Sequence, residues 1–256
     1  MVIQPATTAT SPATNPAASP APSAASHTAL RAQLAQARLY LCTDSRAGRG
    51  DFADFVDAAY AGGVDVIQLR DKNLEASAEL DALEVLREVA ERHGKLFSVN
   101  DRADIAALSD APVLHVGQGD LPLDAVRQLL PHTLVGLSTH STEQIDAALL
   151  AGATTPPSAP APLDYFCVGP VWATPTKPDR AAVGTSLVRY AASKATASQA
   201  AGQALPWFAI GGIDQHTVAE IAEAGAQRIV VVRALTEASN PTAAAAHLLA
   251  QLPPLS

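Results

Sequence analysis

A regular alternation of two patterns most constrains what this chain can fold into. Short apolar runs bounded by turn residues alternate with segments that carry apolar residues at helical spacing. Each run is short enough for a strand, and its continuous apolar character is typical of a strand buried on both faces. The eight runs span 38–43, 64–69, 95–99, 113–116, 133–137, 165–168, 207–210 and 228–232.

The segments between the runs predict helices. After the first run, Phe52, Val56 and Ala59 share one helical face, with Asp51 as a candidate N-cap. The residues Ser-Thr-Glu-Gln at 141–144 have the pattern of a capping box. Alternations of roughly 25–30 residues each predict a (β/α)8 TIM barrel. A doubly wound sheet usually stops at about five or six strands, which makes it the weaker alternative.

The ends and interruptions of this pattern set the expected domain boundaries. Residues 1–36 begin with a stretch of mostly Ala, Pro, Ser and Thr and lack a charged segment followed by an apolar core, so no signal peptide is expected. Such a composition buries too little apolar surface to offset its ordering entropy, which predicts a disordered tail. A single barrel domain is expected over 37–256. Two Ala-rich segments, 154–162 and 191–204, are interpreted as insertions on the face opposite the chemistry.

Charge and cysteine content exclude several classes of function. The net charge of −8 argues against a nucleic-acid or membrane-surface binder, so an anionic ligand must meet a local cluster of cations. No apolar run reaches the roughly 18 residues of a membrane span. The two cysteines, Cys42 and Cys167, fall in predicted strands without a CxxC motif. Reduced core thiols and a cytoplasmic location are therefore expected.

In such a barrel the residues that follow each strand converge at one mouth. Arg70, Lys72 and Lys177 would place three cations there, which suits a polyanion such as a diphosphate. Asp101 and Asp120 would lie beside them. Because carboxylates next to so much phosphate charge need a bridging cation, this set predicts a Mg²⁺ site.

Two further loops predict contacts to phosphate. The stretch 164–178 starts as a strand and continues as a loop in which two prolines fix the backbone beside polar side chains. The polar side chains of that loop are Thr174, Thr176 and Lys177. Gly211-Gly212, before a helix expected to begin at Asp214, predicts a backbone-amide site for a second, smaller phosphate.

Each of these groups has a plain structural alternative. Asp101 and Asp120 both stand where a helix N-cap is wanted. Arg70 could form a surface ion pair with Asp71, and Gly211-Gly212 could be only a tight turn. The convergence of such residues favours a site, because every strand end from the second to the seventh carries polar or Gly residues suited to an anion or a metal.

Five motifs in a fixed order resemble the thiamine phosphate synthase (thiamine-phosphate pyrophosphorylase) family, from Leu39 to the last helix. They are Gln68-Leu-Arg-Asp-Lys72, Val99-Asn-Asp-Arg-Ala-Asp-Ile105, His115-Val-Gly-Gln-Gly-Asp-Leu-Pro122, Gly169-Pro with Thr174-Pro-Thr-Lys177, and Ala209-Ile-Gly-Gly-Ile213. The resemblance implies a transferase that joins 4-amino-2-methyl-5-pyrimidinylmethyl diphosphate to 4-methyl-5-(2-phosphoethyl)thiazole. The products are thiamine monophosphate and pyrophosphate.

The resemblance also assigns roles to individual residues. The pyrimidine diphosphate would be held by Gln68, Arg70, Lys72, Asn100 and Lys177. Asp101 and Asp120 would bind Mg²⁺, and Ser138 would lie against the reacting side of the pyrimidine. The thiazole phosphate would be held by Thr174, Thr176, Gly212 and the end of the last strand at Val232 and Arg233. A serine is usual in the family where Arg233 stands here.

The expected mechanism is electrostatic rather than covalent. No Ser–His pair or activated cysteine is evident from the sequence, and His115 and His140 are interpreted as structural histidines without a catalytic role. Arg70, Lys72, Lys177 and Ser138 are the expected catalytic residues. Two alternatives stay open: a thiazole tautomerase, and a non-catalytic barrel that binds a phosphorylated metabolite. The expected partners are small molecules, and self-association into a homo-oligomer is also compatible with the sequence.

Overall fold

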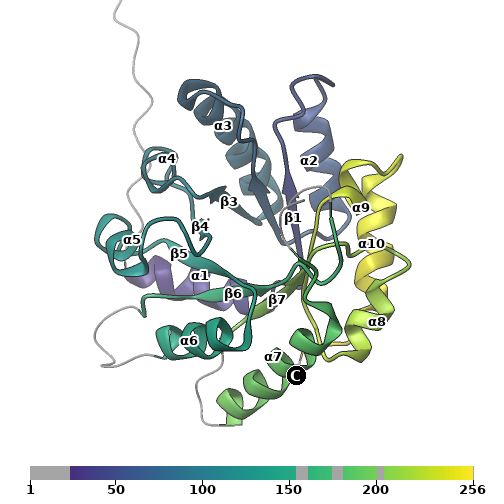
Figure 1. Cartoon of the computed structure of the whole chain (residues 1–256). Helices are drawn as coiled ribbons and strands as arrows, with labels where there is room; N and C mark the ends of the chain where they lie inside the picture. The colour runs from purple at the N-terminus through teal and green to yellow at the C-terminus, as the bar shows by residue number, and fades with distance from the viewer. Residues whose placement is uncertain (1–23, 154–160, 175–180, 201–204, 256) are drawn as a thin grey trace, which may run out of the picture.

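Eight parallel strands form a closed barrel in the order β1 to β8 (Figure 1). The computed structural model describes residues 24–153, 161–174, 181–200 and 205–255. The strands are β1 (Leu39–Thr43), β2 (Val66–Leu69), β3 (Leu96–Asn100), β4 (Val113–Val116), β5 (Leu134–Thr139), β6 (Tyr165–Val168), β7 (Trp207–Ile210) and β8 (Ile229–Val231). The predicted (β/α)8 fold is confirmed, and every strand lies within two residues of its expected ends.

Helices surround the barrel and alternate with the strands (Figure 1). They are α1 (Ala24–Gln36), α2 (Phe52–Ala61), α3 (Ala76–His93), α4 (Ala103–Leu108), α5 (Leu123–Leu129), α6 (Thr142–Gly152), α7 (Gly184–Ala200), α8 (Val218–Glu223), α9 (Arg233–Thr236) and α10 (Pro241–Gln251). At the start of α6 the Ser141 side chain accepts a hydrogen bond from the Gln144 amide, as the capping-box pattern predicts. No helix of the described ranges is both long and apolar enough to cross a membrane.

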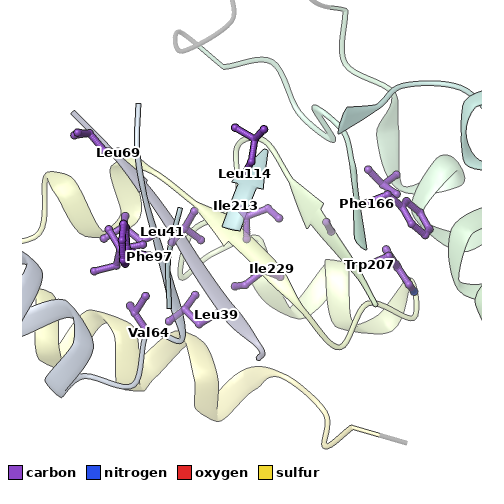
Figure 2. Close-up of a cluster of buried hydrophobic side chains, with 14 of the residues drawn as sticks. Leu39, Leu41, Val64, Leu69, Phe97, Leu114, Phe166, Trp207, Ile213 and Ile229 are labelled. Atoms are coloured by element: carbon purple, nitrogen blue, oxygen red, sulfur yellow. The ribbon is translucent and has the colours of Figure 1, made fainter. Parts of the chain in front are cut away.

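Strand residues alternate between two apolar clusters. Leu39 and Leu41 of β1 pack outward into the layer between barrel and helices, part of which is drawn in Figure 2. Tyr40 and Cys42, the residues between and after them, belong to a separate inner cluster. A strand buried on both faces needs apolar residues at successive positions, which explains why the sequence shows continuous runs rather than alternation.

The expectation of a disordered tail up to residue 36 is wrong for residues 24–36, which form α1. Leu34 and Ala37 are 1% and 2% exposed and pack into the inner cluster of the barrel. Figure 1 shows α1, in purple, beside β5. The few large apolar residues of this segment suffice because Leu30 and Leu34 lie on one side of the helix and pack against the inner cluster. Residues 1–23 lie outside the described part.

One expected insertion is also wrong in part. Residues 191–200 complete α7, and Ala191 is fully buried against the barrel. The Ala-rich composition suits a helix, since Ala has the highest intrinsic helix propensity. Most of the other expected insertion, 154–160, and residues 201–204 lie outside the described ranges.

Candidate active site

A cavity of about 240 Å³ opens at the carboxyl ends of the strands. Because all eight strands are parallel, the loops that follow them meet at this one end. Among the residues that line the cavity are several of those expected from the sequence: Gln68, Arg70, Asn100, Ser138, Thr174, Gly212, Val232 and Arg233. Residues predicted on separate loops are therefore brought together. Thr176 and Lys177 lie outside the described residues.

Two expected metal ligands stand close together near this cavity. Burial raises the pKa of Asp101, and the neighbouring carboxylate of Asp120 raises it further. The Lys72 ammonium lies 3.6 Å from Asp101 Oδ2. Two interacting carboxylates favour a proton or a cation between them, so Asp101 and Asp120 fit a divalent metal ion. Within the described ranges no third His, Cys, Asp or Glu completes a metal-ligand cluster.

The alternative that these two aspartates cap helices is wrong. The N-cap position of α4 is Arg102, and that of α5 is Pro122. Asp120 Oδ2 instead accepts a 2.7 Å hydrogen bond from the Gly117 amide inside its own loop. Asp101 has a left-handed backbone with φ of 62°. Since neither carboxylate is used by a helix end, both remain open to a ligand.

Arg70 is half-buried at the cavity, and its guanidinium bonds to no acceptor among the described residues. The alternative, a surface ion pair with Asp71, does not form. Asp71 Oδ2 instead accepts a 2.7 Å hydrogen bond from Ser45 Oγ. Burial would raise the pKa of Asp71, but this bond and those from the Ser45 and Asn73 amides lower it overall. Arg70 is therefore a cation free for an anionic ligand.

The inner faces of β2 and β3 supply an amide floor to the cavity. Cys42 Sγ donates to Gln68 Oε1 over 2.8 Å, which fixes the orientation of the Gln68 amide. Gln68 Nε2 then lies 3.4 Å from Asn100 Oδ1. The two side chains thus present fixed donors and acceptors to a planar, polar ligand ring.

Gly211 and Gly212 are required by a close approach of two loops. Both have positive φ values, 104° and 70°. A Cβ at Gly211 would stand 2.5 Å from Pro170, and one at Gly212 would stand 2.8 Å from Trp172 Cβ. The loop after β6 thus packs directly on the loop after β7. The helix expected at Asp214 begins later, at Val218.

Residues at two strand ends line the same cavity and carry unbonded backbone amides. The N–H groups of Gly212, Arg233 and Ala234, all on residues that line it, bond to no acceptor in the described part of the chain. Gly212 and Ala234 are half-buried, where N–H groups are normally paired, whereas Arg233 is exposed. Unpaired amides that line one cavity are therefore suited to an anion such as a phosphate.

Comparison with known proteins decides the family. The thiamine monophosphate synthase family matches residues 39–235, from β1 into α9. The chain belongs to this family. It is 64% identical to the thiamine-phosphate synthase of Arthrobacter sp. (strain FB24), over 87% of this chain and 97% of that protein. It is 53% identical to the thiamine-phosphate synthase of Mycobacterium ulcerans (strain Agy99), over 87% and 98%. Among solved structures, thiamine phosphate pyrophosphorylase from Pyrococcus furiosus superposes with a TM-score of 0.70 at 27% identity, covering 86% of this chain and 95% of that one.

One feature of this thiamine monophosphate synthase family member is missed by sequence reasoning. His115 Nε2 lies 2.9 Å from Ser138 Oγ, so a Ser–His pair does exist. His115 is 8% exposed and lines the cavity. The contact follows from the strand register, in which His115 pairs with Gly136, so that Ser138, two residues on, points inward as well. His140 also lines the cavity, and its Nδ1 contacts the Gly169 carbonyl; a structural role for it stays a prediction.

Proposed function

We propose that this chain joins 4-amino-2-methyl-5-pyrimidinylmethyl diphosphate to 4-methyl-5-(2-phosphoethyl)thiazole, giving thiamine monophosphate and pyrophosphate. The observation that carries the proposal is a single cavity with two different regions for anions. Arg70 and the nearby Lys72, Asp101 and Asp120 provide charged side chains on one side. Backbone amides that bond to no acceptor among the described residues provide the other. Two phosphorylated substrates that must meet require this arrangement.

The charged side suits the diphosphate. Asp101 and Asp120 would hold Mg²⁺, which when bound supplies positive charge to the departing pyrophosphate. Arg70 has no partner in the described part of the protein, and Lys72 is 63% exposed at its side chain, so both can turn toward the ligand. Lys177 would add a third cation. Charges already in place need no reorganisation as the bond breaks.

The amide floor suits the pyrimidine. Gln68 and Asn100 present donors and acceptors whose orientation is already fixed, and Ser138 Oγ adds a hydroxyl from β5. Together they would orient the pyrimidine so that its methylene carbon faces the second substrate. Orientation of this kind replaces entropy that two free reactants would otherwise lose.

The amide side suits the phosphate of the thiazole. Gly212 and the turn at Arg233 and Ala234 would donate backbone N–H groups to it. Thr174 lines the same cavity, and Thr176 follows two residues later. The family's usual serine is replaced here by Arg233, but a backbone amide serves as well as the one that a serine would supply.

The residues of the chain act on charge and position. As the C–O bond to the diphosphate breaks, positive charge develops on the pyrimidine methylene and spreads to the amino group, while Arg70, Lys72 and Lys177 stabilise the pyrophosphate. The thiazole nitrogen then attacks the methylene carbon. That nitrogen carries no proton, so no general base is needed for the attack. The Ser138–His115 pair would therefore position a substrate rather than form a covalent intermediate.

The test is incubation of the purified protein with both substrates and Mg²⁺, with pyrophosphate release followed over time. Release should require all three components. A tautomerase would act on the thiazole phosphate alone and has no need of the two aspartates together with Arg70 and Lys72. A non-catalytic binder would bind thiamine monophosphate without metal-dependent turnover. Pyrophosphate release without the thiazole phosphate would also contradict the proposal.

We place this reaction in the cytoplasm. The support is that Cys42 and Cys167 are both free and buried, which is compatible with a reducing compartment. Self-association into a homo-oligomer stays a prediction, which sedimentation of the purified chain would test.

A further inference from the structure

A chain of hydrogen bonds runs from the centre of the barrel to the active-site cavity. Tyr40 and Tyr165 hydroxyls lie 3.2 Å apart. Tyr165 Oη lies 3.1 Å from His115 Nδ1, and His115 Nε2 lies 2.9 Å from Ser138 Oγ. The four side chains come from β1, β6, β4 and β5, so strands on opposite sides of the barrel are joined.

These four side chains are buried, and three of them, Tyr40, His115 and Ser138, also line the cavity. Tyr40 and Tyr165 are 1% and 0% exposed, and burial raises the pKa of both phenols far above their usual range. Gly136 makes room for these side chains, because a Cβ there would stand 2.0 Å from the Tyr165 ring. Phe208 packs edge-on against both tyrosine rings. Burying hydroxyl groups costs more free energy than burying apolar side chains, so hydroxyls at the barrel centre indicate a role beyond packing.

The chain has two internally consistent orientations of its protons. In the outward one, His115 Nε2–H donates to Ser138, whose own proton then faces the cavity. In the inward one, Ser138 donates to Nε2, Nδ1–H donates to Tyr165, and the Ser138 oxygen presents lone pairs to the cavity. Positive charge develops on the pyrimidine and its amino group in the proposed reaction, so only the inward orientation stabilises the transition state there.

We propose that His115 and Tyr165 are positioning residues that hold the Ser138 hydroxyl with its lone pairs facing the pyrimidine. The orientation toward the pyrimidine rests on the proposed function, whereas the hydrogen-bonded chain itself does not. His115 acts through Ser138, and Tyr165 acts through His115 by accepting the Nδ1 proton and so fixing the tautomer.

The first experiment is independent of turnover. In ¹⁵N NMR of the imidazoles, assigned with a His115→Gln variant, neutral His115 should show the proton on Nδ1. Tyr165→Phe removes the acceptor of that proton and should shift the population toward the Nε2–H form. A proton on Nε2 in the unmodified protein would overturn the proposal, whether or not the protein makes thiamine monophosphate.

The second experiment uses kinetics. Tyr165→Phe should lower kcat roughly fivefold, the scale of one net hydrogen bond, with both KM values nearly unchanged. The loss should vanish in a Ser138→Ala background, because the chain then has nothing to orient. The proposal would be overturned if Tyr165→Phe lowered kcat equally in the Ser138→Ala background, or if it did not lower kcat in the otherwise unmodified protein.

Two variants of His115 separate its contacts. His115→Gln can still reach Ser138 and should retain more activity than His115→Asn, which can reach only Tyr165. The reverse order would contradict a role through Ser138. Since the His115 carbonyl also accepts from the Asp101 amide, the half-saturating Mg²⁺ concentration should be measured and should not change.

A matched control is Tyr60→Phe. Tyr60 is also buried, and its hydroxyl donates a 2.7 Å hydrogen bond to the Leu96 carbonyl. This bond is not part of the series of hydrogen bonds from Tyr40 to Ser138. Tyr60→Phe should lower the melting temperature without changing kcat. If Tyr60→Phe lowered kcat as much as Tyr165→Phe, the effect would belong to barrel stability and the proposal would fail.

Discussion

The two ends of the barrel treat charge in opposite ways. At the base, the carboxylate of Asp164 is completely buried, and Arg127 Nη2 lies 2.9 Å from its Oδ2. His27 and Arg31 of α1 approach its Oδ1 at 3.3 and 3.5 Å. At the mouth, Asp101 stands beside another carboxylate, and Arg70 has no partner among the described residues.

The difference separates groups that hold the fold from groups that wait for a ligand. A buried charge that is paired inside the protein contributes to the stability of the fold. Its removal leaves the partner charge unpaired in the protein interior, which costs free energy. A charge left unpaired at a cavity destabilises the empty protein and binds the ligand more strongly. Changes at the base should therefore alter unfolding, and changes at the mouth should alter turnover.

The largest effect is expected at the two mouth aspartates. Asp101→Asn and Asp120→Asn should each lower kcat by roughly a thousandfold, because each removes a metal ligand and its charge. The melting temperature should stay level or rise, since a pair of like charges is removed; a raised pKa means that the ionised form of Asp101 costs folding energy.

Asp110→Asn is the matched control for Asp101→Asn. Asp110 also has a left-handed backbone, with φ of 50°, but it lies in the turn after α4. Asp110→Asn should change neither kcat nor the melting temperature. Near-normal turnover of Asp101→Asn at saturating Mg²⁺ would remove this residue from the metal site.

The base should give the opposite result. Asp164→Asn should destabilise the fold by about 3 kcal/mol, because the cations around it lose their buried counter-charge. The kcat of the folded fraction should not change. Chemical denaturation and turnover, measured on one preparation, would check both statements, and a loss of kcat with normal stability would contradict the division between the two ends.

Acid should have the same effect as that substitution. Burial would raise the pKa of Asp164, but the bond with His27 and the charge of Arg127 lower it overall. A lowered folded pKa gives stability that is present above the unfolded value, near pH 4, and is lost as the pH falls through the folded value. Asp164→Asn should lack this part of the acid transition.

The smallest effect separates the two substrates within the mouth. Thr176→Val removes one hydroxyl and should raise KM for the thiazole phosphate roughly tenfold, the scale of a hydrogen bond to a charged group. Lys177→Met should instead slow the release of pyrophosphate, because a charge that stabilises the leaving group is lost. Initial rates with each substrate varied in turn would test this. A Thr176→Val variant that weakened only the pyrimidine diphosphate would reverse the assignment.

The barrel and much of its mouth could be predicted because both follow from local pattern. Strand runs such as 113–116 are long enough to recognise, and parallel strands carry residues such as Arg70 and Asn100 to one end. The role of α1 could not be predicted, since Leu30 and Leu34 are its only large apolar residues and their partners lie on the barrel base. The Ser138–His115 contact required the register between β4 and β5, which no local pattern fixes.

The position of α1 against the barrel has a consequence for the order in which the chain can fold during synthesis. Its acidic anchor, Asp164, lies far along the chain, and Arg228 holds the Ala35 carbonyl from just before the last strand. A ribosome therefore releases α1 long before its docking surface exists. This helix must stay undocked until β6 is made and settle only when β8 pairs with β1, so the helix that precedes the first strand is one of the last elements to be secured.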